Sequence, residues 1–304
     1  MVSPCYFELY ETGELDRRIE KAYKILESCE ICPHKCKVNR TENQKGFCRS
    51  GINPVVSSYN PHYGEEPPIS GIYGSGTIFF TNCTMRCIYC QNYPISQLGN
   101  GKEVSVDDLA FMMLYLQKKS CHNINFVTPT HFVPQILKAL KLAIKRGFKL
   151  PLVYNTSGYE SIEILKLLDG IVDIYLPDMK YADEKVAFKY SGIKNYPEIN
   201  QSAIKEMYRQ VGDLKTDKMG IAYRGVLIRH LVLPYNLAGS KKILDFLKKE
   251  VSLTITIGIM SQYFPAYKAV DDPKLKYRIT PEEYNEVVEY ALSLGFKNLL
   301  IQGI

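Results

Sequence analysis

Residues 76–90 read GTIFFTNCTMRCIYC, an apolar run followed at once by three closely spaced cysteines. The run GTIFF has the composition of a buried β-strand. The loop after it holds Cys83, Cys87 and Cys90 with the spacing C-x3-C-x2-C. In sheets of parallel strands, ligands bind at the carboxyl ends of the strands. The stretch therefore predicts a functional loop at the end of a core strand.

Strand and helix signals alternate from this stretch to the end of the sequence. Because this alternation implies parallel strands joined by right-handed crossovers, we expect an α/β fold. Six or seven such units favour a partial or full (β/α) barrel, with a doubly wound open sheet as the alternative. The further strands are expected in residues 123–128, 149–156, 170–178, 225–234, 252–260 and 298–304, and the helices in residues 105–119, 134–146, 160–168, 183–212, 240–250 and 281–294.

The first 70 residues do not show this alternation. They contain one helical stretch over residues 15–28 and a cysteine-rich segment, and a turn-rich run covers residues 57–76. We therefore expect a small cysteine-rich N-terminal extension over residues 1–70 and the barrel core over residues 71–304.

The composition is that of a globular protein, with 46% hydrophobic and 23% charged residues in a chain of 304. The longest apolar runs are shorter than the roughly 18 residues that a membrane span needs. The N-terminal sequence lacks the basic start and apolar stretch of a signal peptide. We expect a cytoplasmic protein with no membrane partner, in which clustered cysteines bind metal or act in catalysis instead of forming disulfides.

The net charge of +6 is modest for this length, and the lysines are spread over several expected helices. Such a distribution favours solvated helix faces over a nucleic-acid surface. We therefore do not expect a nucleic-acid partner.

The number of thiols in the loop indicates which metal group they would bind. Structural zinc sites and iron-sulfur clusters are ordinarily closed by four protein ligands. Here the loop offers three cysteines and no nearby histidine. Three thiolates on a cubane cluster leave one iron open to a chelating substrate. A zinc loop, or three cysteines packed in a core, is the alternative.

This loop, with Tyr89 just before its last cysteine, resembles the signature of the radical S-adenosylmethionine (SAM) enzymes. The resemblance implies a 4Fe-4S cluster held by Cys83, Cys87 and Cys90, whose fourth iron is chelated by SAM. It further implies reductive cleavage of SAM to a 5′-deoxyadenosyl radical that abstracts hydrogen. A low-potential electron donor of the flavodoxin or ferredoxin type would supply the electron.

Two cations lie in otherwise apolar strands, Lys180 in PDMK and Arg229 in LIRHLVLP. An unpaired charge in such a position is costly. Either the two cations pair with acids such as Asp178, or they hold the anionic end of the ligand.

The sequence also resembles the activating enzymes of glycyl radical proteins, typified by the pyruvate formate-lyase activase. The Asp-x-Lys at the end of their fourth strand matches Asp178 and Lys180, and their fifth-strand arginine matches Arg229. Residues 128–131 read TPTH where that family has a Gly-Gly-Glu type motif, so glycine's conformational freedom is absent. From these matches and from the other strand ends, we expect the cofactor to be bound by Tyr89, Thr128, Thr130, Asn155, Thr156, Asp178, Lys180, Arg229 and Gln262. We expect Arg229 and the three cysteines to be the catalytic residues.

A second cysteine group precedes the barrel. Cys29, Cys32, Cys36 and Cys48 are separated by two, three and eleven residues. Four cysteines can close a site, so we expect a second metal site that holds zinc or another 4Fe-4S cluster. This block resembles the PflX-type branch of the activase homologues.

These observations predict a radical SAM oxidoreductase that abstracts hydrogen from a glycine or another residue of a partner protein. One alternative keeps the radical chemistry and directs it at RNA or a small metabolite. An alternative of another class is a nonenzymatic iron-sulfur or zinc-binding protein.

Overall fold

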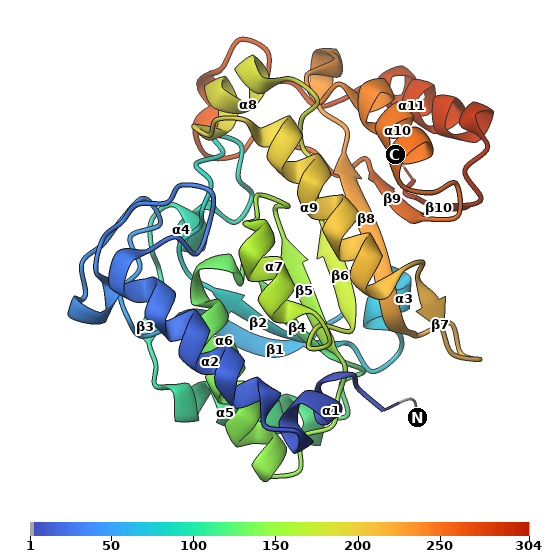
Figure 1. The fold of residues 1–304 in the computed structure, drawn as a ribbon. Coiled ribbons are helices and arrows are strands. Elements are labelled where there is room, and N and C mark those ends of the chain that lie inside the picture. Colours follow the sequence, from blue (N-terminus) through green and yellow to red (C-terminus); the bar gives the residue numbers. More distant parts are fainter. Residues whose placement is uncertain (1–2, 304) are drawn as a thin grey trace.

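A ten-stranded sheet organises the protein, whose computed structural model describes residues 3–303 (Figure 1). The strand order is β10-β9-β8-β6-β5-β4-β2-β1-β3, and β7 pairs with β8. The parallel strands are β2 (Ser75–Phe80), β4 (Ile124–Val127), β5 (Leu152–Thr156), β6 (Ile174–Pro177), β8 (Ala222–Leu231), β9 (Thr256–Met260) and β10 (Asn298–Ile301). The antiparallel strands are β1 (Val55–His62), β3 (Lys102–Glu103) and β7 (Lys215–Thr216).

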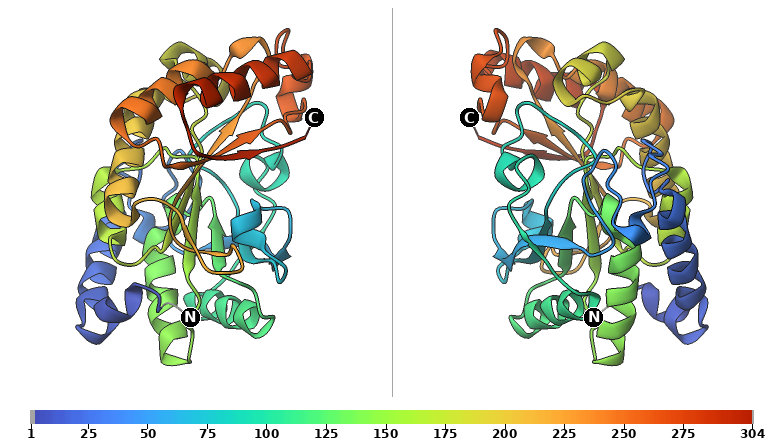
Figure 2. Two further views of the ribbon diagram at one scale, coloured as in Figure 1. Left: turned by 90° about the vertical axis from the view of Figure 1, so that its right-hand side faces the viewer. Right: turned by 90° about the vertical axis from the view of Figure 1, so that its left-hand side faces the viewer.

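The sheet is curved but does not close. Its two outermost strands, β10 and β3, do not pair with each other within residues 3–303. Figure 2 shows α2, α9 and α10 on one side of the strands, and α3 and α4 on the opposite side. The expected α/β fold is therefore confirmed in its partial-barrel form, and full closure is not observed.

The helices that cover the parallel strands begin where the sequence signals predict. Ser105 caps α5 in a capping box with Asp108, and Thr280 caps α11 in the same way with Glu283. Leu109, Met112, Met113 and Leu116 form a buried apolar face on α5. The covering helices are α5 (Val106–Lys118), α6 (Val133–Lys145), α7 (Ile162–Leu168), α8 (Glu184–Ser191), α9 (Tyr196–Val211), α10 (Ser240–Glu250) and α11 (Pro281–Leu294).

The run over residues 57–76, expected to be turn-rich, instead contains most of β1 and the short helix α3 (Pro67–Ser70). Strand β1 pairs antiparallel with β2, from Val56 opposite Phe80 to His62 opposite Ser75. Burial along β1 does not alternate regularly, because only its second residue is fully buried. A sequence pattern of period two is the usual signal for a strand, so this strand could not be recognised by periodicity.

The N-terminal segment packs onto the same core as the barrel. Helices α1 (Tyr6–Glu11) and α2 (Glu14–Lys24) contribute buried side chains to one hydrophobic cluster shared with the strands. The fully buried Arg40 donates to the carbonyl oxygens of Gly51 and His131, both at 2.7 Å.

The expected boundary at residue 70 between the N-terminal extension and the barrel core stays a prediction. Within residues 3–303, every helix falls short of the length and apolar character needed to cross a membrane.

Candidate functional site

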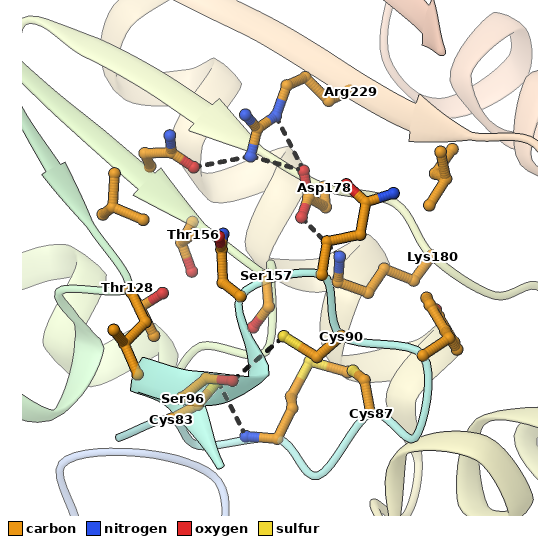
Figure 3. Close-up of a pocket in the computed structure, with 18 of the residues that line it drawn as sticks. Cys83, Cys87, Cys90, Ser96, Thr128, Thr156, Ser157, Asp178, Lys180 and Arg229 are labelled. Atoms are coloured by element: carbon orange, nitrogen blue, oxygen red, sulfur yellow. Dashed lines mark hydrogen bonds and ion pairs between the residues drawn. The ribbon is translucent and has the colours of Figure 1, made fainter. Parts of the chain in front are cut away.

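The carboxyl ends of the central parallel strands surround a cavity of about 210 Å³ (Figure 3). It lies where parallel sheets ordinarily bind ligands. In Figure 3 the three cysteines occupy one end of the cavity, and Arg229 with Asp178 occupies the other. All the residues expected in the barrel site line it except Thr130, namely Cys83, Cys87, Tyr89, Cys90, Thr128, Asn155, Thr156, Asp178, Lys180, Arg229 and Gln262.

The three thiols of the loop after β2 face this cavity together. Burial raises the pKa of Cys83 to about 12 and that of Cys87 to about 11, and the neighbouring thiols add to both increases. Lys180 acts in the opposite direction and favours both thiolates. Since metals bind thiolates, such buried thiols need a metal's charge to deprotonate fully.

Hydrogen bonds to sulfur further define the cysteine loop. Donors directed at thiolates tune the reduction potential of an iron-sulfur cluster. Ser96 and Ser191 were not expected at the site, because neither belongs to a recognisable motif. The contacts run from Ser191 Oγ to Cys87 Sγ (3.0 Å), between Ser96 Oγ and Cys90 Sγ (3.1 Å), and from the Met85 amide to Cys83 Sγ (3.3 Å).

The donor set at this end of the cavity fits a cluster better than a single ion. Among residues 3–303, no group of three or more His, Cys, Asp or Glu side chains is arranged to hold one metal ion. A four-iron cluster spans a larger distance than one ion, and soft thiolates are its usual ligands. Cys83, Cys87 and Cys90 line one cavity, and their thiol chemistry is that of cluster ligands.

At the other end of the cavity, Asp178 lies between two cations. Its Oδ2 accepts from Lys180 Nζ (2.6 Å), and its Oδ1 accepts from Arg229 Nε (2.9 Å). Although burial disfavours the carboxylate, these cations hold the pKa of Asp178 below its usual value. Arg229 also donates to Asn155 Oδ1 (2.7 Å) and Glu65 Oε2 (3.2 Å). Of the two alternatives for the buried cations, the structure thus shows pairing with acids.

Glu65 was missed because it follows β1, in the run interpreted as turns. Its Oε1 accepts from Asn155 Nδ2 (3.1 Å), in addition to its contact with Arg229. A carboxylate in a loop gives no periodic signal, so only the three-dimensional structure places it beside residues of β5 and β8.

Thr130 does not lie at the cavity, contrary to the prediction that it contacts the cofactor. It is buried, and its hydroxyl donates to Glu160 Oε1 (2.6 Å). His131 is buried as well, and its Nε2 donates to the carbonyl oxygen of Thr81 (2.9 Å). Burial lowers the pKa of His131 to about 3. Neither side chain is placed to donate a proton into the cavity.

Glu160 is a buried acid that the sequence did not reveal. Besides Thr130, the hydroxyls of Thr156 and Tyr154 (3.2 Å) donate to its carboxyl group. Burial raises the pKa of Glu160 to about 7, although these three hydroxyl groups oppose the increase. Thr156 lines the cavity, whereas Glu160 does not. Glu160 therefore orients the Thr156 hydroxyl through a hydrogen bond made outside the cavity.

Thr128 adopts the backbone conformation that glycine favours. Its φ angle is +59°, in the left-handed region that is sterically costly for a β-branched residue. Its amide donates to the carbonyl oxygen of Asn155 (2.9 Å). The left-handed turn is thus kept at this strand end even though threonine occupies it.

The four cysteines of the N-terminal block lie in one folded loop region, although no three of them are arranged to hold a single ion within the described residues. Burial raises the pKa of Cys32, and the nearby thiols of Cys48, Cys29 and Cys36 raise it further. The loop folds back on itself, since the Phe47 amide donates to Cys36 Sγ (3.4 Å). These four thiols do not line the barrel cavity.

The chain matches the family model of the Radical SAM superfamily over residues 77–247, and it belongs to that superfamily. Members use a 4Fe-4S cluster and SAM, and the chain is accordingly assigned as a radical SAM enzyme. The nonenzymatic alternative is set aside on this ground.

Two proteins of Methanocaldococcus jannaschii are similar over nearly the whole chain. The uncharacterized protein MJ0674 is 34% identical, with 93% of this chain and 80% of that protein covered. The uncharacterized protein MJ0808 is 24% identical, with 91% and 81% covered.

Among solved structures, the fold is similar to HydG, a maturase of the [FeFe]-hydrogenase, with a TM-score of 0.52 and 12% identity over 96% of this chain and 67% of that one. It is also similar to anSMEcpe with bound AdoMet and the Kp18Cys peptide, with a TM-score of 0.51 and 13% identity over 72% and 60%.

Replacing Thr128 by glycine should raise the free energy of unfolding by about 0.5–1 kcal/mol. The left-handed conformation costs threonine roughly 1–2 kcal/mol, and the greater entropy of glycine in the unfolded chain offsets part of this gain. Urea denaturation measures the change. Ser120→Gly is the matched control, because Ser120 is exposed and also left-handed, with φ at +64°. If Thr128→Gly were less stable than wild type while Ser120→Gly was not, the contacts of the threonine side chain would contribute more to stability than its backbone strain costs.

Glu160→Gln should remove a pH-dependent loss of stability. With a folded-state pKa of about 7 and an unfolded value near 4.3, Glu160 is protonated in both states at low pH. Between these values the unfolded chain loses its proton first, so native stability falls as pH rises. The stability of wild type relative to Glu160→Gln should decline by about 3 kcal/mol between pH 4 and 8 in urea titrations. The exposed Glu289→Gln is the control, and parallel curves for wild type and Glu160→Gln would contradict the assignment.

Proposed function

We propose that this radical SAM enzyme is of the activating-enzyme-like, PflX-type branch, and that it abstracts hydrogen from a glycine or another residue of a partner protein. The observation that carries the proposal is the single cavity that combines three thiols with Asp178, Lys180 and Arg229. The Asp-x-Lys and the strand arginine match that branch in type and in position. The peptide bound to anSMEcpe supports a polypeptide substrate by likeness of fold.

In this proposal the residues at the two ends of the cavity have different roles. Cys83, Cys87 and Cys90 would hold the cluster, which when bound supplies the electron that cleaves SAM. Lys180 gives only one of its ammonium hydrogens to Asp178, so Lys180, together with Arg229, would donate charge-assisted hydrogen bonds to the cofactor's carboxylate. Carbonyl and hydroxyl oxygens at the ends of β4 and β5 would accept from its ammonium group. The buried Tyr89 forms part of the apolar wall that excludes water.

The proposal includes a low-potential donor of the flavodoxin or ferredoxin type. Cys83 and Cys90 are half-buried, so the cluster end of the cavity is within reach of the surface. Arg49 and Arg86 lie near this end and provide positive charge for an acidic donor.

The proposal also includes a second metal site in the N-terminal block. Its four cysteines would close a second 4Fe-4S cluster or, once drawn together around the ion, would bind zinc. Because Cys29, Cys32 and Cys48 are buried, a metal held there would stabilise the loops around it.

Cys87→Ala should abolish formation of 5′-deoxyadenosine from SAM under dithionite reduction, because two thiolates cannot hold the cluster. The product is measured by liquid chromatography, together with the electron paramagnetic resonance spectrum of the reduced protein with and without SAM. Cys121→Ala, which removes a buried thiol outside the cavity, is the control and should remain active. Product formation by Cys87→Ala at the wild-type rate would refute the cluster assignment.

Cys32→Ala should lower the metal content while leaving SAM cleavage largely intact. Elemental analysis distinguishes the two candidates, since loss of one zinc indicates a zinc site and loss of four irons indicates a cluster. An unchanged metal content would eliminate the second site. Complete loss of 5′-deoxyadenosine formation would instead make the N-terminal block part of the active site.

A further inference from the structure

A second hollow, of about 520 Å³, adjoins the cysteine-lined cavity. We propose that it is the substrate side of the active site, and that Glu66 binds a cationic group of the substrate there, at the end of an aliphatic chain. This inference rests on the proposed radical chemistry and specifies the class of group that is held beside it.

The two hollows share a wall. Arg229, Met260 and Gln262 line both of them. Hydrogen abstraction requires the substrate to be held against the bound cofactor, so a substrate cavity must adjoin the cofactor cavity.

Two consecutive glutamates enter this hollow from the segment after β1, and they differ in their contacts. Glu65 is committed to Arg229 and Asn155. Glu66 is only 8% exposed, yet among residues 3–303 no hydrogen bond or ion pair engages its carboxyl group. Burial raises the pKa of Glu66, partly offset by Arg229. The Glu66 oxygens keep some contact with solvent, but a largely buried carboxylate is poorly hydrated, and a cation that pairs with it would replace the missing hydration.

A glycine in β9 provides the space for the Glu66 carboxyl group. A Cβ atom at Gly258 would lie 2.8 Å from Glu66 Oε1. Glycine in the interior of a strand weakens it and marks a place where another group approaches closely. Gly258 lies opposite Arg229 in the neighbouring strand, so the space opens directly beside the ion pairs of the first cavity.

The charges around the shared wall do not balance. The cations there are the half-buried Lys180 and Arg229, whereas the carboxylates are Asp178, Glu65 and Glu66. Asp178 and Glu65 are paired with the cations, which leaves the charge of Glu66 in excess. A ligand cation would neutralise it, and a protonated Glu66 that binds a neutral acceptor is the alternative.

The rest of the hollow has both apolar and amide side chains. Met260 and the β10 residues Leu299, Leu300 and Ile301 supply its apolar surface, and Gln262 and Gln302 supply amide groups. Apolar walls that end at a carboxylate suit an alkyl chain with a terminal ammonium group. The chain carbons would then lie along the wall shared with the first cavity.

The test compares two probes of similar shape, n-butylammonium and 1-butanol, by ligand-observed nuclear magnetic resonance titration. The cluster-containing protein is saturated with SAM, so that the first cavity is filled and the probes do not bind there. Wild type should bind n-butylammonium at least about tenfold more tightly than 1-butanol, because a charge-assisted hydrogen bond is lost with the alcohol. Glu66→Gln should lose this preference, and the exposed Glu289→Gln should keep it.

Equal binding of the two probes by wild type, or an unchanged preference in Glu66→Gln, would overturn the proposal. Weaker SAM binding by Glu66→Gln would assign the residue to the cofactor and would also overturn it. Gly258→Ala, which displaces the carboxyl group and keeps its charge, provides a second variant that should lose the preference. Formation of 5′-deoxyadenosine by wild type is measured separately, so failure of the radical chemistry is distinguishable from failure of the cation site.

Discussion

A buried carboxylate between two cations holds the active end of the sheet together. Asp178 follows β6 and Arg229 lies in β8, and the Met179 amide donates to the Arg229 carbonyl oxygen (2.9 Å) beside their ion pair. The side chains of Arg229 and Asp178 are only 17% and 14% exposed, so removal of either one would leave a charge that water compensates poorly. Glu65 joins the same arginine from a segment 164 residues away in the sequence. The positions of these strand ends, and with them the shape of the cavity, depend on this one group of charges.

The repeating architecture and the cysteine loop could be predicted because their signals are local. Capping boxes at Ser105 and Thr280 mark helix starts, and apolar runs such as residues 252–260 mark strands. Closure of the sheet could not be predicted, because it depends on whether β10 meets the opposite edge, and periodicity carries no information about that contact. Strand β1 escaped recognition for a related reason, since it is stabilised by pairing with β2 and not by an alternating pattern of its own.

In the candidate site, too, residues with a local sequence signal could be predicted, and the partners that come from distant parts of the chain could not. Cysteines and charged residues at strand ends were recognisable from their types and positions. The partners that determine their roles come from elsewhere, as with Ser191 at Cys87 and Glu160 at Thr156. Thr130 illustrates the consequence, because a hydroxyl two residues after the cavity-lining Thr128 is turned toward a buried acid. Residue type identifies a candidate, but only packing determines which way the side chain points.

The two cysteine loops are joined by several hydrogen bonds. His34 Nε2 donates to the carbonyl oxygen of Thr84 (2.8 Å), and Arg86 donates to that of Phe47 (2.7 Å) while lying over its ring. Ordering a loop residue costs about 1–2 kcal/mol in backbone entropy. These contacts are made by protein groups alone and hold the loop without any contribution from iron. Cluster assembly on a loop held in this way loses less backbone entropy than assembly on a disordered one.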